Sequence, residues 1–325
     1  DLQKNQSITI NDVGGTATSL QLRSVGSGSG TIGVDVDVTA VGTLTATSVL
    51  TGGKVTLRTT AAGGDILVDS IVASGNVVDL QARNSIREVS PGDASADITA
   101  TSVQLQATDG SIDVYLAASA ASVTATTTGS TVTLKNDTAL SLGTSTARTL
   151  TLNVGGVISQ TGVITADTLV ANATNGSNIT LTGNGGTPNL PNQVGSFAAS
   201  SVGTGGIRGN VAFTTGIPLD VAAAGIQGAA VTLTTAGGLT DTGSITGTSL
   251  TAVNTGSGTI VLDNPANDVA TLSLTNTGRA VTYVDATGFA VAGIAGSQAT
   301  LTAAGTITQN TGAGAAVSAA ALAIT

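Results

Sequence analysis

The stretch AVTLTTAGGLTDTGSITGTSLTA, residues 230–252, alternates small apolar residues with threonine, serine and glycine, and its one charge is Asp241. A related stretch, TLTLNVGGVISQTGVITADTLVA, occupies residues 149–171. A shorter one, ATLTAAGTITQNTG, occupies residues 299–312. Self-similarity of this kind is typical of repeat architectures, in which each copy adds a structural unit to its neighbour.

The copies align residue by residue. From Val231 to Ala299 the shift is 68 (299 − 231), and it also carries Leu233 to Leu301. Between the first two copies the shift is 81 (231 − 150) at every aligned apolar position. These positions are Leu150, Leu152, Ile158, Ile164, Leu169, Ile179 and Leu181 in the first copy, and Val231, Leu233, Leu239, Ile245, Leu250, Ile260 and Leu262 in the second.

Within each copy an apolar residue alternates with a polar or small one, as in Val231-Thr232-Leu233. This period of two predicts short strands with one buried face. Glycine, asparagine, threonine and serine separate the strands, and no segment sustains a helical spacing. Before residue 145 the repeat is weaker but the same alternation continues, for example in SVQLQATDGSIDVYL, residues 102–116.

Two all-β architectures fit this pattern, a β-sandwich array and a parallel β-helix. A sandwich needs tight hairpin turns and a bulky core, whereas aromatic residues make up only 2% of the chain. Stacked valine, isoleucine, leucine and alanine suit the narrow interior of a β-helix. We therefore predict a parallel β-helix, and coils of about 20 residues would give roughly 15–16 coils. Similar texts at Asn192-Gln193-Val194 and Asn267-Asp268-Val269 indicate asparagine ladders at the turns.

The predicted organisation is one continuous solenoid. Residues 1–145 would form divergent coils, and residues 146–325 would form superrepeats at about 150–230, 231–298 and 299–325, the last of them partial.

Charge and composition exclude several classes of protein. The net charge is −9, and the 10 basic residues are scattered, so no nucleic-acid-binding face is predicted. No window holds about 18 consecutive apolar residues, so membrane insertion is not predicted. The chain has no Cys and no His, which removes thiol chemistry and the commonest catalytic base. It also starts at Asp1 rather than Met, and residues 286–325 are uncharged, so we expect a processed chain that continues further.

The segment NPANDVATLSLTNTGRAVTYVDATGFAVAGI, residues 264–294, resembles the repeat regions of filamentous-haemagglutinin-type exoproteins. These are large bacterial proteins of the two-partner-secretion and autotransporter kind. The resemblance covers residues 150–325, and the earlier residues only in style. It implies a right-handed parallel β-helix, an extracellular or cell-surface location, and a role in adhesion or as a stalk or fibre. The family's amino-terminal secretion domain is not visible in this sequence.

We predict no catalytic, cofactor-binding or metal-binding residue. Asp35 and Asp37 would share one strand face, and so could Asp109 and Asp113 across a turn, but solvated outward positions explain both pairs. The same explanation applies to a calcium site at Asp35 or Asp37. The dinucleotide-like spacing of glycines at 28, 30 and 33 precedes a strand rather than a helix, which indicates a turn.

Paired threonines recur along the chain, and regular rows of them on a flat face would suggest ice binding. In the aligned copies they recur at the long shifts of the repeat rather than once per coil, so we expect ordinary outward positions. The pairs are Thr43/Thr45, Thr131/Thr133, Thr149/Thr151, Thr232/Thr234 and Thr300/Thr302.

The function that this sequence favours is a non-enzymatic structural or adhesive segment of a secreted or cell-surface rod or fibre. Its partners would be further copies, end to end or side by side, or a continuation of the same chain, because neither terminus looks like a cap. Cell-surface glycans are a further candidate partner. A glycan-binding module and a polysaccharide-degrading enzyme are the alternatives, with ice binding less favoured. The aromatic residues available to a glycan site, which are spread out, are Tyr115, Phe197, Phe213, Tyr283 and Phe289.

Overall fold

The structure is a computed structural model that describes residues 7–11, 17–23, 34–186, 189–311 and 316–325, the first two segments by their backbone only. The chain divides into two compact units, residues 1–155 and 156–325. Each unit is described by itself. Both consist of β-strands joined by short connections, and a single turn of 3-10 helix, Thr204–Gly206, lies in the C-terminal unit among the residues described.

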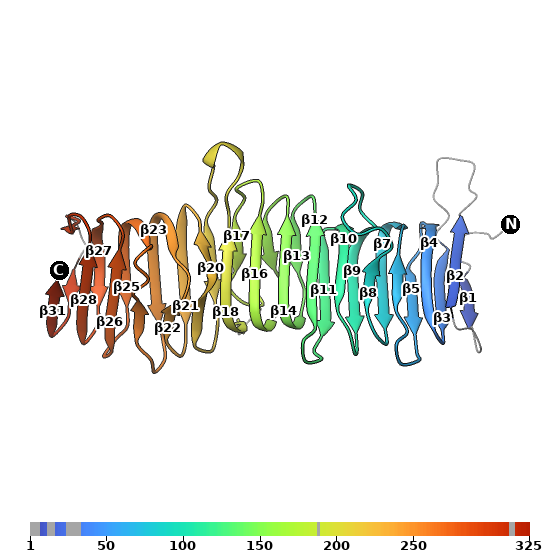
Figure 1. The fold of residues 1–325 in the computed structure, drawn as a ribbon, viewed down its shortest axis with the longest axis horizontal. Coiled ribbons are helices and arrows are strands. Elements are labelled where there is room, and N and C mark those ends of the chain that lie inside the picture. Colours follow the sequence, from blue (N-terminus) through green and yellow to red (C-terminus); the bar gives the residue numbers. More distant parts are fainter. Residues whose placement is uncertain (1–6, 12–16, 24–33, 187–188, 312–315) are drawn as a thin grey trace. The chain divides into compact units, whose positions relative to one another are not determined.

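The strands of the N-terminal unit stack in two rows, drawn in blue to green in Figure 1. The odd-numbered row holds β1 (Ser7–Asn11), β3 (Asp35–Ala40), β5 (Val55–Thr59), β7 (Ile71–Ala82), β9 (Ile98–Ala107), β11 (Ala120–Ala125) and β13 (Leu140–Leu142). The even-numbered row holds β2 (Ala17–Arg23), β4 (Thr43–Thr51), β6 (Ile66–Val68), β8 (Ile86–Glu88), β10 (Ile112–Ala117), β12 (Thr131–Asn136) and β14 (Ser145–Val154).

The C-terminal unit has the same arrangement. Its odd-numbered row holds β15 (Ile158–Gln160), β17 (Ile179–Leu181), β19 (Val211–Thr214), β21 (Ala230–Thr235), β23 (Ile245–Asn254), β25 (Asp268–Thr275) and β27 (Ala290–Ala295), followed by β29 (Thr308–Gln309) and β30 (Val317–Ser318). The even-numbered row holds β16 (Ile164–Ala173), β18 (Gln193–Ser200), β20 (Leu219–Gln227), β22 (Leu239–Asp241), β24 (Ile260–Leu262), β26 (Ala280–Asp285), β28 (Gln298–Ala303) and β31 (Ala321–Ile324).

The registered strand pairs of both rows are parallel, for example β5 with β7 and β21 with β23. Each coil therefore contributes one odd and one even strand, which confirms the parallel β-helix and excludes the sandwich. Short pairings close a third side, such as the end of β4 with the start of β7 and the end of β20 with the start of β23.

The chain forms about 14 turns rather than the 15–16 predicted from its length. Some coils are close to the expected length, as between the register partners Thr131 and Thr149. Others are much longer, as between the register partners Ile179 and Val211. The excess residues loop out between strands, so an average coil length taken from sequence overestimates the number of coils.

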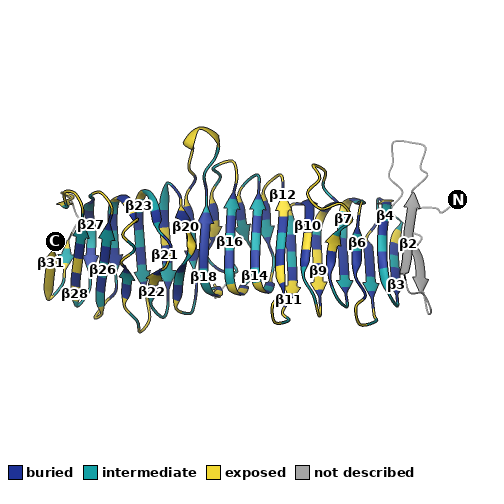
Figure 2. Ribbon diagram, in the orientation of Figure 1, coloured by how far each residue is buried: buried dark blue, intermediate teal, exposed yellow. Residues whose placement is uncertain are grey.

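Aliphatic ladders fill the interior, and Figure 2 shows the alternation of buried and exposed residues along the strands. In the N-terminal unit one ladder runs Val36, Val55, Val78, Val103, Ala121 and Leu142. In the C-terminal unit an equivalent ladder runs Ile179, Val211, Val231, Leu250, Leu272 and Val291. All of these side chains are buried. Because each inward residue packs on its counterparts in the neighbouring coils, stability comes from stacking rather than from any one coil.

The sequence repeat corresponds to seven strands, or three and a half coils. The shift of 68 carries Val231 on β21 to Ala299 on β28, and the shift of 81 carries Ile158 on β15 to Leu239 on β22. Because seven is odd, an aligned position moves from the odd row to the even row. Consecutive copies of the repeat therefore present equivalent residues on opposite sides of the coil.

Buried asparagines connect successive coils by hydrogen bonds at the turns, as the sequence predicts. The Oδ1 atom of Asn192 accepts a hydrogen bond from the backbone N–H of Ile164 at 2.9 Å, and that of Asn267 accepts one from Ile245 at 2.7 Å. Each side chain is fully buried. Asn254 and Asn276 add a direct amide–amide contact of 3.1 Å between neighbouring coils. These amides satisfy backbone donors that the corners would otherwise leave without partners.

Candidate functional site

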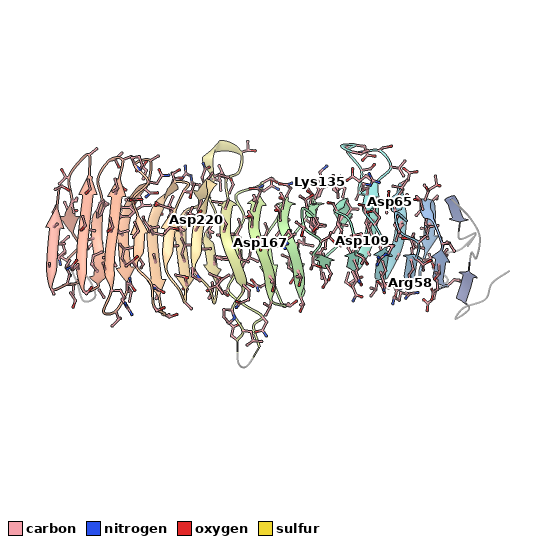
Figure 3. The ribbon with its side chains drawn as sticks, turned by 60° about the horizontal axis from the view of Figure 1, so that its bottom comes forward. Arg58, Asp65, Asp109, Lys135, Asp167 and Asp220 are labelled. Atoms are coloured by element: carbon pink, nitrogen blue, oxygen red, sulfur yellow. The ribbon has the colours of Figure 1, made fainter. Side chains whose placement is uncertain are left out.

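The acidic residues considered as candidates occupy outward positions in the N-terminal unit. Asp35 and Asp37 lie on the outer side of β3, on the same face of the strand. Asp35 accepts a hydrogen bond from the backbone N–H of Lys54, and Asp37 pairs with Arg58 at 2.9 Å. Asp109 pairs with Arg83 at 3.0 Å. Figure 3 labels Arg58 and Asp109 among the side chains of this unit.

Asp113 does not join Asp109. It stands on β10, in register with Arg87 on one side and Thr133 on the other. The glycines at 28, 30 and 33 lie outside the residues that the structure describes.

The expectation that paired threonines do not recur once per coil is wrong at one place. Thr131 and Thr133 on β12 lie directly opposite Thr149 and Thr151 on β14, in the next coil. A shift of a single coil is too short to show in a comparison of long copies. On the other side of β12, Asp113 and not a threonine stands opposite Thr133. All these threonines alternate with buried neighbours, so they are outward residues as predicted.

All five aromatic side chains considered for a glycan site are buried. Phe197 and Phe213 stack inside the C-terminal unit with ring centroids 4.0 Å apart, and Tyr283 packs edge-on against Phe289 at 5.2 Å. Tyr115 is 3% exposed and lies beneath the ammonium of Lys135, 3.6 Å from the ring centroid. Four of these rings fill the core, whereas Tyr115 lies on the outer face of β10 and is covered by Lys135, its register partner on β12. None of the five therefore offers an exposed stacking platform.

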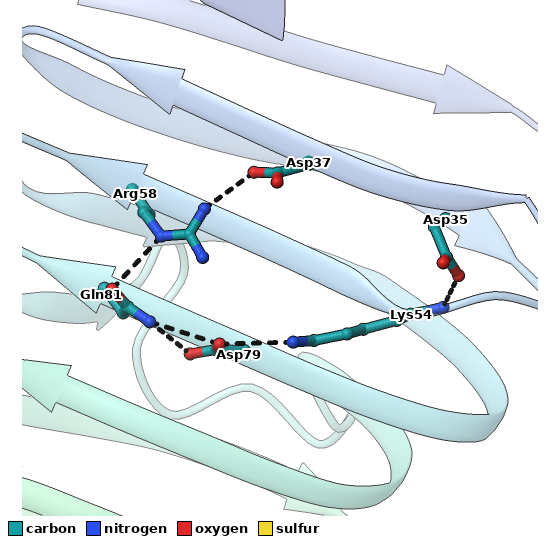
Figure 4. A network of polar contacts seen from close by, with 6 residues as sticks. All are labelled: Asp35, Asp37, Lys54, Arg58, Asp79 and Gln81. Carbon is teal, nitrogen blue, oxygen red and sulfur yellow. Dashed lines mark hydrogen bonds and ion pairs between the residues drawn. The ribbon is translucent and has the colours of Figure 1, made fainter. Parts of the chain in front are cut away.

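A network of polar side chains crosses three coils of the N-terminal odd row (Figure 4). The Arg58 guanidinium donates to Asp37 at 2.9 Å and to Gln81 Oε1 at 3.2 Å. The Gln81 amide in turn donates to Asp79 at 3.0 Å. The ammonium of Lys54 lies 3.5 Å from the Asp79 carboxylate. Each side chain fixes the next, so the network presents its remaining donors and acceptors in set positions.

Two hollows adjoin this network. One, of about 200 Å³, is lined by Asp79, Gln81, Gln104, Leu105, Gln106, Ser122 and Thr124. The other, of about 270 Å³, is lined by Arg58, Thr59, Thr60, Gln81, Ala82, Arg83, Gln106 and Thr108. Gln81 and Gln106 line both and lie between them, so the two hollows adjoin, and together we call them the polar groove.

Strand register explains how residues far apart in sequence meet in the polar groove. Arg58, Gln81, Gln106 and Thr124 are register partners on β5, β7, β9 and β11. The sequence predictions did not include this set, because they considered charged pairs that are close together in the sequence. The signal is present, since Leu80-Gln81-Ala82 and Leu105-Gln106-Ala107 repeat the same tripeptide.

A second polar cluster surrounds Asp97, immediately before β9. Burial raises the pKa of Asp97 to about 7. The nearby charge of Glu88 also raises this pKa, whereas a hydrogen bond from the Tyr115 backbone N–H lowers it. Tyr115 and Asp97 also exchange a backbone hydrogen bond of 2.9 Å, from the Asp97 N–H to the Tyr115 carbonyl. The Tyr115 hydroxyl donates to Asp137, which raises the pKa of this tyrosine to about 12. This cluster joins a connecting segment to the solenoid.

The C-terminal unit has a hollow of a different kind, of about 360 Å³. Glycines form much of its wall, together with Pro218, Leu219, Leu239, Asp220, Thr240 and Thr259. The Asp220 carboxylate already accepts hydrogen bonds from the Thr240 hydroxyl at 2.9 Å and the Thr242 N–H at 3.1 Å. This hollow therefore offers mostly bare backbone, whereas the polar groove offers long polar side chains.

In the described part of the chain, no group of three or more acidic, His or Cys residues is arranged to hold a metal ion. No helix among the described residues has the length and apolar character to cross a membrane.

Comparison with known proteins finds one repeat family. A family model described as repeats of unknown function (DUF5649) matches residues 129–196 and 208–276. Its two copies begin just before β12 and just before β19, and these strands are seven apart in chain order. The family repeat therefore has the same seven-strand length as the repeat in the sequence. Because the two matches together span less than half of the chain, they establish the kind of repeat rather than the whole protein's family. No curated protein and no solved structure matches the chain.

Proposed function

We propose that this chain is a non-enzymatic structural segment of an exported bacterial β-solenoid protein, which extends or displays that protein at the cell surface. The observation that carries the proposal is the stacking of coils on an aliphatic interior in both units. The only buried side-chain polar atom without a hydrogen-bond partner among the described residues is the Thr246 hydroxyl. An interior satisfied in this way suits a stack whose role is mechanical.

The composition of the outer surface supports the same proposal. Each charged side chain that lines the polar groove has a partner of opposite charge beside the groove, which suits binding better than catalysis. The resemblance to filamentous-haemagglutinin-type repeats and the match to a repeat family agree with a segment built from copies of one unit.

The test is electron microscopy of the purified chain combined with sedimentation velocity. We expect elongated particles, because coils that stack on one another extend along one axis. Compact particles would contradict the proposal.

A further inference from the structure

The polar groove carries more chemistry than a structural coil requires. Stacking depends on the inward residues, so the outward positions of β5, β7, β9 and β11 are free to hold any soluble side chain. These outward positions hold an arginine, an aspartate and three glutamines along the polar groove. We propose that the polar groove binds a neutral oligosaccharide chain that lies across these four strands. This binding goes beyond the structural role, and it does not require the chain to assemble.

The dimensions of the groove suit a chain rather than a single sugar. Its lining comes from four consecutive strands of the odd row. Neighbouring strands lie about 4.8 Å apart, so the groove runs for roughly 15 Å. Gln81 and Gln106 stand between its two hollows, because they line both of them. A ligand with a repeating unit can place successive units against successive coils.

One wall of the groove is fixed in advance. Gln81 is held between Arg58 and Asp79 by hydrogen bonds of 3.2 and 3.0 Å. The Asp79 side chain is only 11% exposed and is held by Lys54. A carboxylate has more lone pairs than these contacts use, so it can also accept from a ligand hydroxyl. Fixed polar groups lose little conformational entropy when a ligand binds.

The opposite wall is unengaged. Gln104, Gln106 and Thr124 are exposed, and within the segments that the structure describes their side chains take part in no hydrogen bond. A primary amide offers two donors and an acceptor in one plane. Adjacent sugar hydroxyls can each donate and accept, so they match amides placed side by side at register positions.

The pairing of charged side chains at the polar groove favours a neutral ligand. Arg58 is paired with Asp37, Lys54 with Asp79, and Arg83 with Asp109. A sulfated or phosphorylated chain needs unpaired cations, and each of these cations already has a carboxylate. A protein partner needs an apolar centre to its interface, whereas the largest apolar lining residue, Leu105, is 2% exposed. Hydroxyl-rich, uncharged chains are the ligands that remain.

The experiment uses the full chain and an array of immobilised cellohexaose, xylohexaose, mannohexaose and laminarihexaose, with a heparin hexasaccharide alongside. We expect at least one neutral hexasaccharide to bind. The double variant Gln104→Ala/Gln106→Ala should weaken that binding about tenfold or more in a calorimetric titration, because several ligand hydrogen bonds disappear. Gln104→Glu/Gln106→Glu keeps the size of the side chains but removes their donors, and it should weaken binding to a similar extent.

The matched control is Thr232→Ala/Thr251→Ala, which changes register partners at outward positions of the odd row in the C-terminal unit. It should leave binding within about twofold of the unmodified chain, since these residues lie in the other unit. Circular dichroism verifies that each variant is folded. The proposal is overturned if no neutral hexasaccharide binds, if only heparin binds, or if the glutamine variants bind as well as the control. None of these results depends on the particle shape that microscopy reveals, so this proposal and the proposed function are tested separately.

Discussion

The two units have the same kind of interior and differ in their outer surfaces. Inside, the ladder of Val55, Val78 and Val103 in the N-terminal unit corresponds to that of Val231, Leu250 and Leu272 in the C-terminal unit. Outside, the N-terminal odd row presents Asp79, Gln104 and Ser122 in register, whereas the C-terminal odd row presents Thr232, Thr251 and Ser273. Of the 10 basic residues of the chain, 8 lie before residue 156.

This difference shows that the fold constrains the inward residues of each strand and leaves the outward residues variable. Inward residues must be apolar and of similar size, because each packs on the coils before and after it. Outward residues must only be soluble. A binding surface can therefore be built on one unit without altering the coil that the other unit shares.

The largest expected effect tests the shared interior. Leu134→Ala in the N-terminal unit and Leu233→Ala in the C-terminal unit each remove a side chain that is 0% exposed. Each should lower the free energy of unfolding by about 2–5 kcal/mol, from lost burial and the cavity left behind. Urea denaturation measures both. A decrease confined to one variant would break the equivalence of the two interiors.

The buried asparagines should show the next largest effect. In the N-terminal unit Asn136 accepts from the Ala118 N–H at 3.0 Å, and in the C-terminal unit Asn267 accepts from Ile245 at 2.7 Å. Asn136→Ala and Asn267→Ala should each lower the free energy of unfolding by about 1–3 kcal/mol, because a buried backbone N–H loses its partner. Both amides also donate, Asn136 to the Thr138 carbonyl at 2.9 Å and Asn267 to the Asp241 carboxylate at 2.6 Å. Asn267→Ala should be the more damaging, because it removes a donor from a buried carboxylate. Urea denaturation again gives the values, and equal stability of either variant and the unmodified chain would refute the corner role.

The pH dependence of stability should also differ between the units. Burial raises the pKa of Asp97 from 3.8 to about 7 and that of Asp241 to about 6. A raised carboxyl pKa favours folding while the native group is protonated, so this stability is present below pH 3.8 and is lost as pH rises through about 7 for Asp97.

Asp97→Asn isolates the N-terminal contribution, because the amide oxygen can still accept from the Tyr115 N–H. The stability of this variant relative to the unmodified chain should increase from pH 4 to about pH 7 and then level off. Thermal melting over this range measures the difference. Asp69→Asn, at an exposed position in the same unit, is the control. A flat difference for Asp97→Asn would show that Asp97 ionises normally.

The smallest expected effects are on the outer surface. Gln104→Ala/Gln106→Ala and Thr232→Ala/Thr251→Ala should each change the free energy of unfolding by no more than about 0.5 kcal/mol. The same urea experiment measures both. A large loss in the glutamine variant would mean that these side chains support the coil, and it would weaken the comparison between a structural interior and a functional exterior.

Much of the fold is predictable from particular residues. The alternation in Val231-Thr232-Leu233 predicts strand β21, and the similar texts at Asn192 and Asn267 predict two amides with the same role. The predicted number of coils is too high because connections of varying length add residues to a coil without adding strands to the rows. The residues between Leu181 and Gln193 and between Ser200 and Val211, for example, both lengthen the coil between the register partners Ile179 and Val211. Loop length has no periodic signal, so sequence analysis could not separate it from coil length.

The candidate site was less accessible to prediction. Asp35 and Asp37 are recognisable because they are close together on one strand, and Asp37 does belong to the polar network. Gln81 and Gln106 lie on different coils, far apart in the sequence, and only strand register makes them neighbours. The stacked threonines of β12 and β14 were missed for the same reason.

The strands, the buried face of each, the aliphatic interior and the spacing of the repeat can be predicted from local alternation and self-similarity, which are properties of the chain read in order. The fold, by contrast, sets the odd number of strands in the repeat, the burial of the aromatic rings, and the meeting of two arginines and three glutamines along the polar groove. Those outcomes depend on how many residues each coil consumes before it returns to its neighbour, and the sum of many individual loop lengths sets that number.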